Sequence, residues 1–376
     1  YREFTANHRR SVIRCLQTKH MKFRKINFIG KYAQPQGVAI VKATKRAKTY
    51  MYVQMSFNHG NNNRKGRIVR YDLAVINKYV NKKNKHNQLY KALIKSNKYR
   101  YSLHTSKAER KKLKNQAKKK LSKTNYKLYQ AVVLGPKFKT GHGQSFGYDP
   151  KGKQLYNASY RLKHDHGTKA HLVRLQTISR SKLKPIKTRK FVLRISKNAW
   201  FGFIRHTKGQ KYYYLQLHDL TFDKNGKFYF SRTFGLRDKI LLNVTRGIRK
   251  GYKPSKHESQ FSHDVGQKVQ IFQGTLTKNS VKVKLVQQVS NAIGSVGQGL
   301  SYSGKNNRVY LTYDCAFMSF PIKKIKHQMT TSDVNFTVLQ SKYYRESEGM
   351  GITSSGYGYM IFNRVAEAAR SDMKVR

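Results

Sequence analysis

The stretch Gly143-Gln144-Ser145-Phe146-Gly147-Tyr148 decides the fold, because its pattern returns along the chain. Gly297-Gln298-Gly299-Leu300-Ser301-Tyr302 repeats the order Gly-Gln-x-apolar-x-Tyr, and each stretch is followed at the same spacing by an apolar-Tyr pair, Leu155-Tyr156 or Val309-Tyr310. Weaker copies begin at Pro35, Leu217 and Gly349, and each also leads to a pair or triplet rich in Tyr, Phe and Met. Such a repeat indicates one structural unit that is used several times.

Each copy has the pattern of a β-hairpin: an alternating apolar run, a turn rich in Gly, Asp, Asn and Lys, and a second run that ends in aromatic residues. One hairpin cannot bury its apolar face alone, so the five copies must pack on one another. The sequence therefore predicts an all-β, β-propeller-like fold of about five blades, with residues 1–376 as a single domain. A β-solenoid or two β-sandwiches are the alternatives.

Alternation predicts further strands between the copies, at residues 170–178, 190–195, 199–204, 212–217, 240–244, 269–272 and 281–286. A short apolar piece at residues 12–16 would pair with the last hairpin and close the ring, which removes exposed sheet edges. Residues 127–132 precede the copy at Gly143 as residues 284–289 precede the copy at Gly297. Both segments are therefore expected to be strands.

The period changes between about residues 74 and 125, where β-branched residues are few and lysines are many. Ser106 with Glu109 has the spacing of a capping box at the start of a helix. We expect a basic helical insertion at residues 78–122.

The charge is the strongest functional signal. The chain has 79 Lys and Arg against 16 Asp and Glu, a formal net charge of +63. Such a surface attracts polyanions, and the candidates are nucleic acid, anionic cell-wall polymers, acidic glycans and anionic membranes. The bases are interleaved with alternating apolar residues, so they are expected on a folded surface.

Two cysteines, Cys15 and Cys315, exclude a disulfide-rich scaffold, and they would either pair or remain buried thiols. No apolar run is long enough for a transmembrane helix. The first residue, Tyr1, fits a processed secretory chain or a trimmed one.

The repeated Gly-Gln phrases at Gly143 and Gly297 resemble the repeat of the helveticin J family and of the related adhesion exoshield proteins of lactobacilli. The resemblance covers roughly residues 25–365; the basic helical insertion and the copy at Leu217 depart from it. It implies a secreted, highly cationic β protein that is held non-covalently on a Gram-positive cell surface. Its function would be that of an adhesin or, as in helveticin J, of a bacteriocin.

Catalytic and metal-binding patterns are weak. No pair among the sixteen carboxylates has a glycosidase context, and Ser145 does not lie in a Gly-x-Ser-x-Gly elbow. His164-Asp165-His166 with His171 fits a polar loop better than a metal site. We therefore expect a protein that is not an enzyme and that needs no cofactor or metal.

Two groups of residues are binding candidates. The inner strand of a propeller blade faces the central channel, so His142, Gln144, His218 and Gln298 would line a ligand pocket there; the alternative is that the Gly-Gln phrase serves close packing and internal hydrogen bonds. The polyanion-binding candidates are Lys111, Lys112, Lys118, Lys119, Lys120, Arg189 and Lys190. On this interpretation the insertion is a cationic arm; otherwise it is a solvated helix.

The expected function is therefore that of a secreted adhesin that binds teichoic acids, mucin and acidic host glycans by charge, most strongly in acid. A helveticin-type bacteriocin is the alternative, and a killing assay separates the two. A nucleic-acid-binding protein fits less well, although non-specific binding to nucleic acid follows from the charge alone. A homo-oligomer or surface layer is compatible with this function.

Overall fold

The computed structural model describes residues 33–42, 48–57, 65–80, 88–160, 172–196, 212–234, 268–278, 280–290, 297–313, 316–327, 329, 331–340, 346–363 and 374–375. The segments predicted as strands at residues 12–16, 199–204 and 240–244 lie outside these residues. So do both cysteines and the histidine-rich segment from His164 to His171.

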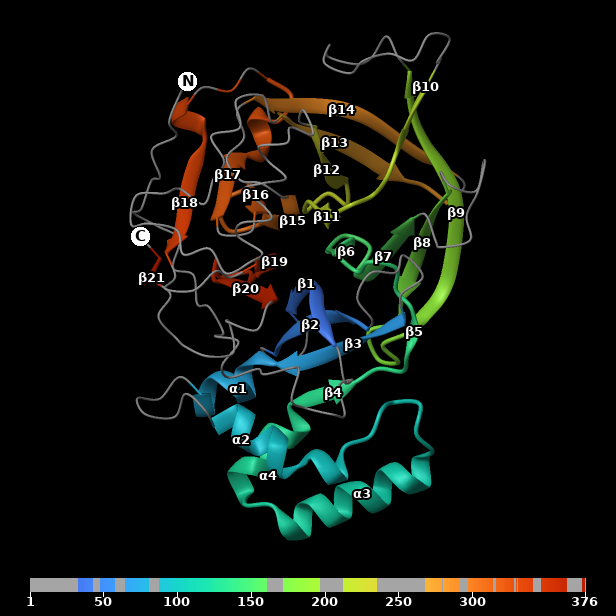
Figure 1. Ribbon diagram of the computed structural model, residues 1–376, viewed down its shortest axis with the longest axis vertical. Helices are drawn as coiled ribbons and strands as arrows, with labels where there is room; N and C mark the ends of the chain where they lie inside the picture. The colour runs from blue at the N-terminus through green and yellow to red at the C-terminus, as the bar shows by residue number, and fades with distance from the viewer. Residues whose placement is uncertain are drawn as a thin grey trace, which may run out of the picture.

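Four antiparallel sheets of four or five strands stand around a central axis as the blades of a β-propeller (Figure 1). Blade 1 contains β1 (Gln34–Lys42), β2 (Thr49–Ser56), β3 (Lys65–Asp72), β4 (Val132–Leu134) and β5 (Phe138–Lys139). Blade 2 contains β6 (Phe146–Asp149), β7 (Gln154–Tyr160), β8 (Leu172–Ile178), β9 (Pro185–Ser196) and β10 (Tyr212–Leu215).

Blade 3 contains β11 (Thr221–Phe222), β12 (Phe228–Phe234), β13 (Lys268–Leu276) and β14 (Val281–Ser290). Blade 4 contains β15 (Gly297–Ser303), β16 (Arg308–Tyr313), β17 (Ala316–Pro321) and β18 (Asn335–Gln340), and β21 (Lys374–Val375) pairs with β18 at its outer edge. Short 3-10 helices occur at Asn97–Tyr99, Ile322–Lys324 and Thr331–Asp333.

The fifth copy of the repeat forms a two-stranded sheet, β19 (Glu346–Ile352) with β20 (Gly358–Asn363). β19 contacts β15 on one side and β1 on the other, so this hairpin closes the ring. The predicted propeller is confirmed, but about five blades must be corrected to four complete blades, because in the described residues no further strand pairs with β20.

The inner strands β1, β6, β11, β15 and β19 bring the five copies together around the axis (Figure 1). Within each hairpin, a small residue of the inner strand pairs with a tyrosine: Ala39 with Tyr52, Gly147 with Tyr156, Thr221 with Tyr229, Ser301 with Tyr310, and Gly351 with Tyr359. The repeated Tyr of the sequence therefore lies across the hairpin from a small side chain.

Apolar clusters fill the spaces between neighbouring blades. Phe222, Phe228, Phe230 and Phe272 of blade 3, for example, pack with Leu175 and Leu193 of blade 2. Comparable clusters join the other neighbours around the ring, including the β19–β20 hairpin and blade 1. The blades thus bury much of their apolar surface against their neighbours, as the repeat predicts.

Helices fill the connection between β3 and β4: α1 (Leu73–Val80), α2 (Gln88–Lys95), α3 (Lys107–Lys120) and α4 (Lys123–Gln130). The helical region is thus wider than the predicted range 78–122, and the strand expected at residues 127–132 is largely wrong. Ser122 caps α4 by accepting a hydrogen bond from the backbone N of Asn125 at 3.3 Å. Leu128 and Tyr129 are then buried at helical spacing from Asn125. No helix in the described part of the chain has the length and apolarity to cross a bilayer.

Candidate functional site

The channel between the five inner strands is crossed by a layer of polar side chains. Each copy contributes the residue that stands where the first copy has Gln144: Gln36, Gln144, His218, Gln298 and Glu348. We call these five residues the polar girdle. β1, β15 and β19 each have a bulge at this residue, so the register places Glu348, and not Met350, at the Gln position of the last copy. The last repeat therefore begins two residues earlier than the sequence suggested.

Gln144 connects the girdle across the channel. Its Nε2 donates to Gln298 Oε1 at 2.5 Å and to Glu348 Oε2 at 3.1 Å, which joins blade 2 to blade 4 and to the β19–β20 hairpin. All three side chains are buried. Gln36 is buried as well, and its Oε1 accepts no hydrogen bond within the described residues.

His218 completes the girdle on the side of blade 3. Its ring makes an edge contact with His142, with 6.4 Å between the ring centroids. His218 is partly accessible to solvent, but desolvation by the surrounding protein lowers the pKa of its imidazole despite an opposing backbone hydrogen bond. The nearby Arg232 lowers this pKa further.

The structure thus brings together the four predicted channel residues in two contacts, His142 with His218 and Gln144 with Gln298. Gln144 and Gln298 are buried and bonded to each other, so this geometry favours internal hydrogen bonding at the Gly-Gln phrase over an open pocket there. A buried amide that lost its partner would be costly, which explains the recurrence of Gln.

Two carboxylates next to the channel have structural partners. Asp219 accepts hydrogen bonds from the backbone N of Ser231 at 2.6 Å and from the Ser231 hydroxyl. Burial raises the pKa of Asp219 to about 6, and the hydrogen bonds from Ser231 oppose this rise. Asp223 accepts from the backbone N of Asn225 and Lys227 and from the Tyr229 hydroxyl, which fixes the β11–β12 turn.

Small residues let the inner strands approach closely beyond the girdle. A Cβ atom at Gly147 would lie 2.7 Å from the carbonyl oxygen of Leu220, which directly precedes the neighbouring inner strand β11. A Cβ at Gly351 would lie 2.8 Å from Cγ1 of Ile40. Glycine is therefore required at these positions for packing and not for backbone conformation.

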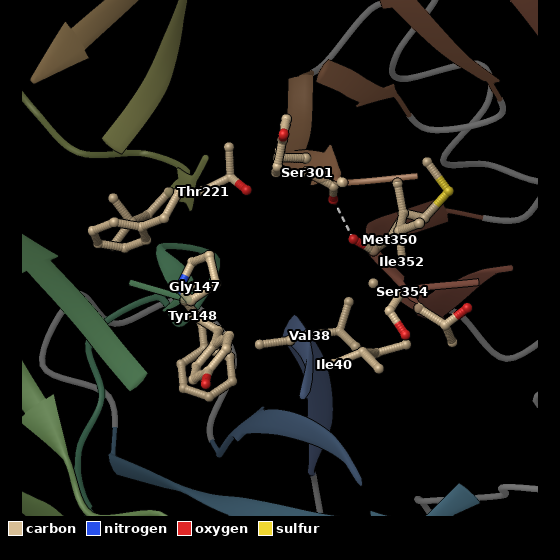
Figure 2. A pocket seen from close by; sticks show the side chains of 18 of the residues that line it. Val38, Ile40, Gly147, Tyr148, Thr221, Ser301, Met350, Ile352 and Ser354 are labelled. Atoms are coloured by element: carbon tan, nitrogen blue, oxygen red, sulfur yellow. Dashed lines mark hydrogen bonds between the residues drawn. The ribbon is translucent and has the colours of Figure 1, made fainter. Parts of the chain in front are cut away.

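A cavity of about 370 Å³ opens at the C-terminal ends of the five inner strands, and all five contribute to its wall (Figure 2). The cavity is lined by one large residue at the equivalent position of each copy: Ile40, Tyr148, Phe222, Tyr302 and Ile352. None of the four predicted channel residues lines this cavity. The signal in the sequence that could have located the cavity is the large apolar or aromatic residue four positions after each residue of the polar girdle.

The predicted polyanion-binding residues lie in two separate regions, α3 and β9 (Figure 1). Lys111, Lys112, Lys118, Lys119 and Lys120 are all exposed on α3, where only Ala117 is buried. Ser106 begins this helix as predicted, because its hydroxyl accepts from the backbone N of Glu109 at 3.2 Å. On β9, Lys190 is exposed, whereas Arg189 is partly buried and donates to the carbonyl of Ser280 on blade 3.

No three or more His, Cys, Asp or Glu side chains of the described residues gather closely enough to hold a metal ion. In comparisons with known proteins, no protein-family model matches the chain, and no curated protein matches it at a significant level. The resemblance to the helveticin J family therefore stays a prediction.

Proposed function

We propose that this protein is a secreted, strongly cationic adhesin that attaches non-covalently, by charge, to anionic cell-wall polymers such as teichoic acids and to mucin and other acidic glycans. On this proposal it has no catalytic role. The observation that supports the proposal best is the separation of charges in the described part of the fold, where four carboxylates are buried and the lysines of α3 are exposed.

Four of the described carboxylates, Asp72, Asp219, Asp223 and Glu348, are buried. Asp72 accepts a hydrogen bond from the backbone N of Val75 at the start of α1, and the other three bond to the partners described above. These negative charges serve turns, a helix terminus and the girdle. They therefore lie away from the exposed lysines of a chain with a net charge of +63.

The exposed lysines of α3 present a dense group of positive charges. Lysine is a compact, strongly hydrated charge on a flexible stem, so such contacts are diffuse and not geometrically specific. Each polymer phosphate or sulfate that is neutralised releases a counterion, and the affinity then falls steeply with salt. Binding should strengthen from pH 7 to pH 4, because accessible carboxylates and the 14 histidines gain protons while phosphate diesters and sulfates remain ionised.

The test is adhesion of the purified protein to mucin and to cells that carry wall polymer, measured across a salt series at pH 4 and at pH 7. We expect release in concentrated salt and stronger retention in acid. Binding that ignores salt, or that strengthens as the pH rises, would reject the proposal.

A pair of charge-matched variants tests the role of α3. In the first, Lys111, Lys112, Lys118, Lys119 and Lys120 are replaced by Gln; in the second, the same change is made at exposed lysines of blades 2 and 3, Lys182, Lys184, Lys187, Lys282 and Lys284. We expect the α3 variant to lose more affinity and more of the salt dependence. Equal losses would assign the binding to net charge and not to the helix.

A further inference from the structure

The cavity at the end of the channel has a charge of one sign. Its charged lining residues are Lys42, Lys153, Arg180 and Lys224, and no Asp or Glu is among the residues that line it. The three lysines are exposed and Arg180 is partly buried. A concave site with positive walls concentrates the field, so it favours an anionic ligand.

Arg180 is the best placed of these cations. Its guanidinium lies over the ring of Tyr148, with 5.9 Å between Cζ and the ring centroid, and its backbone carbonyl accepts from Arg70 Nη1 at 3.5 Å. Within the described residues the guanidinium donates no hydrogen bond. Its planar set of donors is thus oriented and available, and it fits the two oxygens of a carboxylate or phosphate.

Asp149, which directly follows Tyr148, has a hydrogen-bond partner of its own. Asp149 Oδ1 accepts from the backbone N of Lys151 at 3.0 Å, in the turn between β6 and β7. Burial raises the pKa of Tyr148, Arg180 opposes this shift, and Asp149 adds to it, so the phenol stays protonated at neutral pH. Tyr148 therefore offers a neutral hydroxyl beside the guanidinium.

The remaining wall suits a ring. Tyr148, Phe222 and Tyr302 give aromatic surface, while Thr221 and Ser354 bring hydroxyl groups to the same space (Figure 2). Small-molecule sites span about 300–1,000 Å³ and combine apolar walls with a few polar groups. At about 370 Å³ this cavity has the size for one or two sugar rings and not for a long polymer segment.

We propose that this cavity is a saturable site for one anionic sugar unit, in which Arg180 binds the carboxylate or phosphate and the aromatic residues contact the sugar ring. The site is distinct from the lysines of α3 and does not depend on the proposed attachment to polyanions.

The test is isothermal titration of the full chain, in high salt, with glucuronic acid, N-acetylneuraminic acid, glucose 6-phosphate and neutral methyl glucoside. We expect one-to-one binding of at least one acidic sugar and no measurable binding of the neutral one. The acids that bind distinguish a carboxylate from a phosphate ligand. Saturation-transfer NMR should show contact between aromatic protons and the ring protons of the bound sugar.

Arg180→Gln should weaken this binding by about tenfold or more, the effect of losing a charge-assisted hydrogen bond. Lys182→Gln makes the same change of charge at an exposed lysine outside the cavity and should change the affinity by less than about twofold. The α3 variant should keep the sugar site. Binding of no acidic sugar, equal binding of the neutral sugar, or equal losses in Arg180→Gln and Lys182→Gln would overturn the proposal, whatever the outcome for polyanions.

Discussion

Replacing Gln144 by Ala should lower the free energy of unfolding by about 2–3 kcal/mol. The side chain donates to Gln298 at 2.5 Å and to the carboxylate of Glu348 at 3.1 Å, and all three groups are buried. Leaving a buried acceptor without a donor costs about 1–3 kcal/mol, and more when the acceptor is charged. Both acceptors have other interactions, so the two losses should not add in full.

Chemical denaturation gives this free energy directly. In thermal unfolding, we expect a decrease of about 4–6 °C in the midpoint, since a chain of this length shifts by roughly 2 °C per kcal/mol. Gln116→Ala, on the exposed face of α3, is the control and should stay within about 0.5 kcal/mol of the parent. Gln144→Glu should be worse at pH 7 than at pH 4, because it sets a second carboxylate beside Glu348. A Gln144→Ala protein as stable as the control would refute the role of the girdle.

Three further predictions concern the blades and the insertion. Asp219 has a pKa of about 6 in the folded protein against 3.8 for the ordinary group. Its protonated form therefore stabilises the fold fully below pH 4, and this contribution is lost as the pH rises to about 6. In Asp219→Asn, the decrease in stability between pH 4 and pH 7, measured by denaturation, should be smaller by up to about 3 kcal/mol. Gly147→Ala should lower the free energy of unfolding by about 1–3 kcal/mol, because its Cβ would lie 2.7 Å from a backbone oxygen. In the control Gly304→Ala the nearest neighbour of the Cβ would lie at 3.9 Å, so this change should be nearly neutral. Equal unfolding curves for the two variants would contradict this reasoning. Arg100→Lys should lower the free energy of unfolding by about 2 kcal/mol and speed limited proteolysis of the insertion. The reason is that Arg100 donates to the carbonyls of Tyr129 and Val132 and stacks on the Tyr129 ring. Unchanged cleavage would show that these contacts do not hold the insertion in place.

The repeat could be predicted from the sequence because its tyrosines have a fixed partner. Ser301 with Tyr310 and Gly147 with Tyr156 keep the same register, and this pairing makes the phrase recognisable. The copy at Glu348 was misaligned because Gly349-Met350-Gly351 imitates the Gly-Gln-Gly order, and only the bulge between Ser347 and Gly349 shows which residue enters the girdle. A bulge has no distinct sequence pattern here.

The cavity could not be predicted, because its cations come from different parts of the chain. Lys42 ends the inner strand β1 and Lys224 follows the inner strand β11, but Arg180 comes from the connection between β8 and β9. In a sequence with 79 basic residues, nothing marks these few as neighbours. The extent of the helical insertion was missed for a related reason: residues 127–130 have an apolar pattern that suits a strand, and the serine cap at Ser122 decides for a helix.

The position of the closing hairpin has a consequence for synthesis. Asn77 of α1 donates to the hydroxyl of Tyr359 on β20 at 3.1 Å, across a separation of 282 residues. Tyr359 and Ile361 also cover part of the apolar face of blade 1. The first blade therefore leaves the ribosome long before its last neighbour exists, and during that interval it exposes apolar surface that promotes aggregation. Like charges on nascent chains repel one another, so the high net charge would also protect the unfinished ring from association.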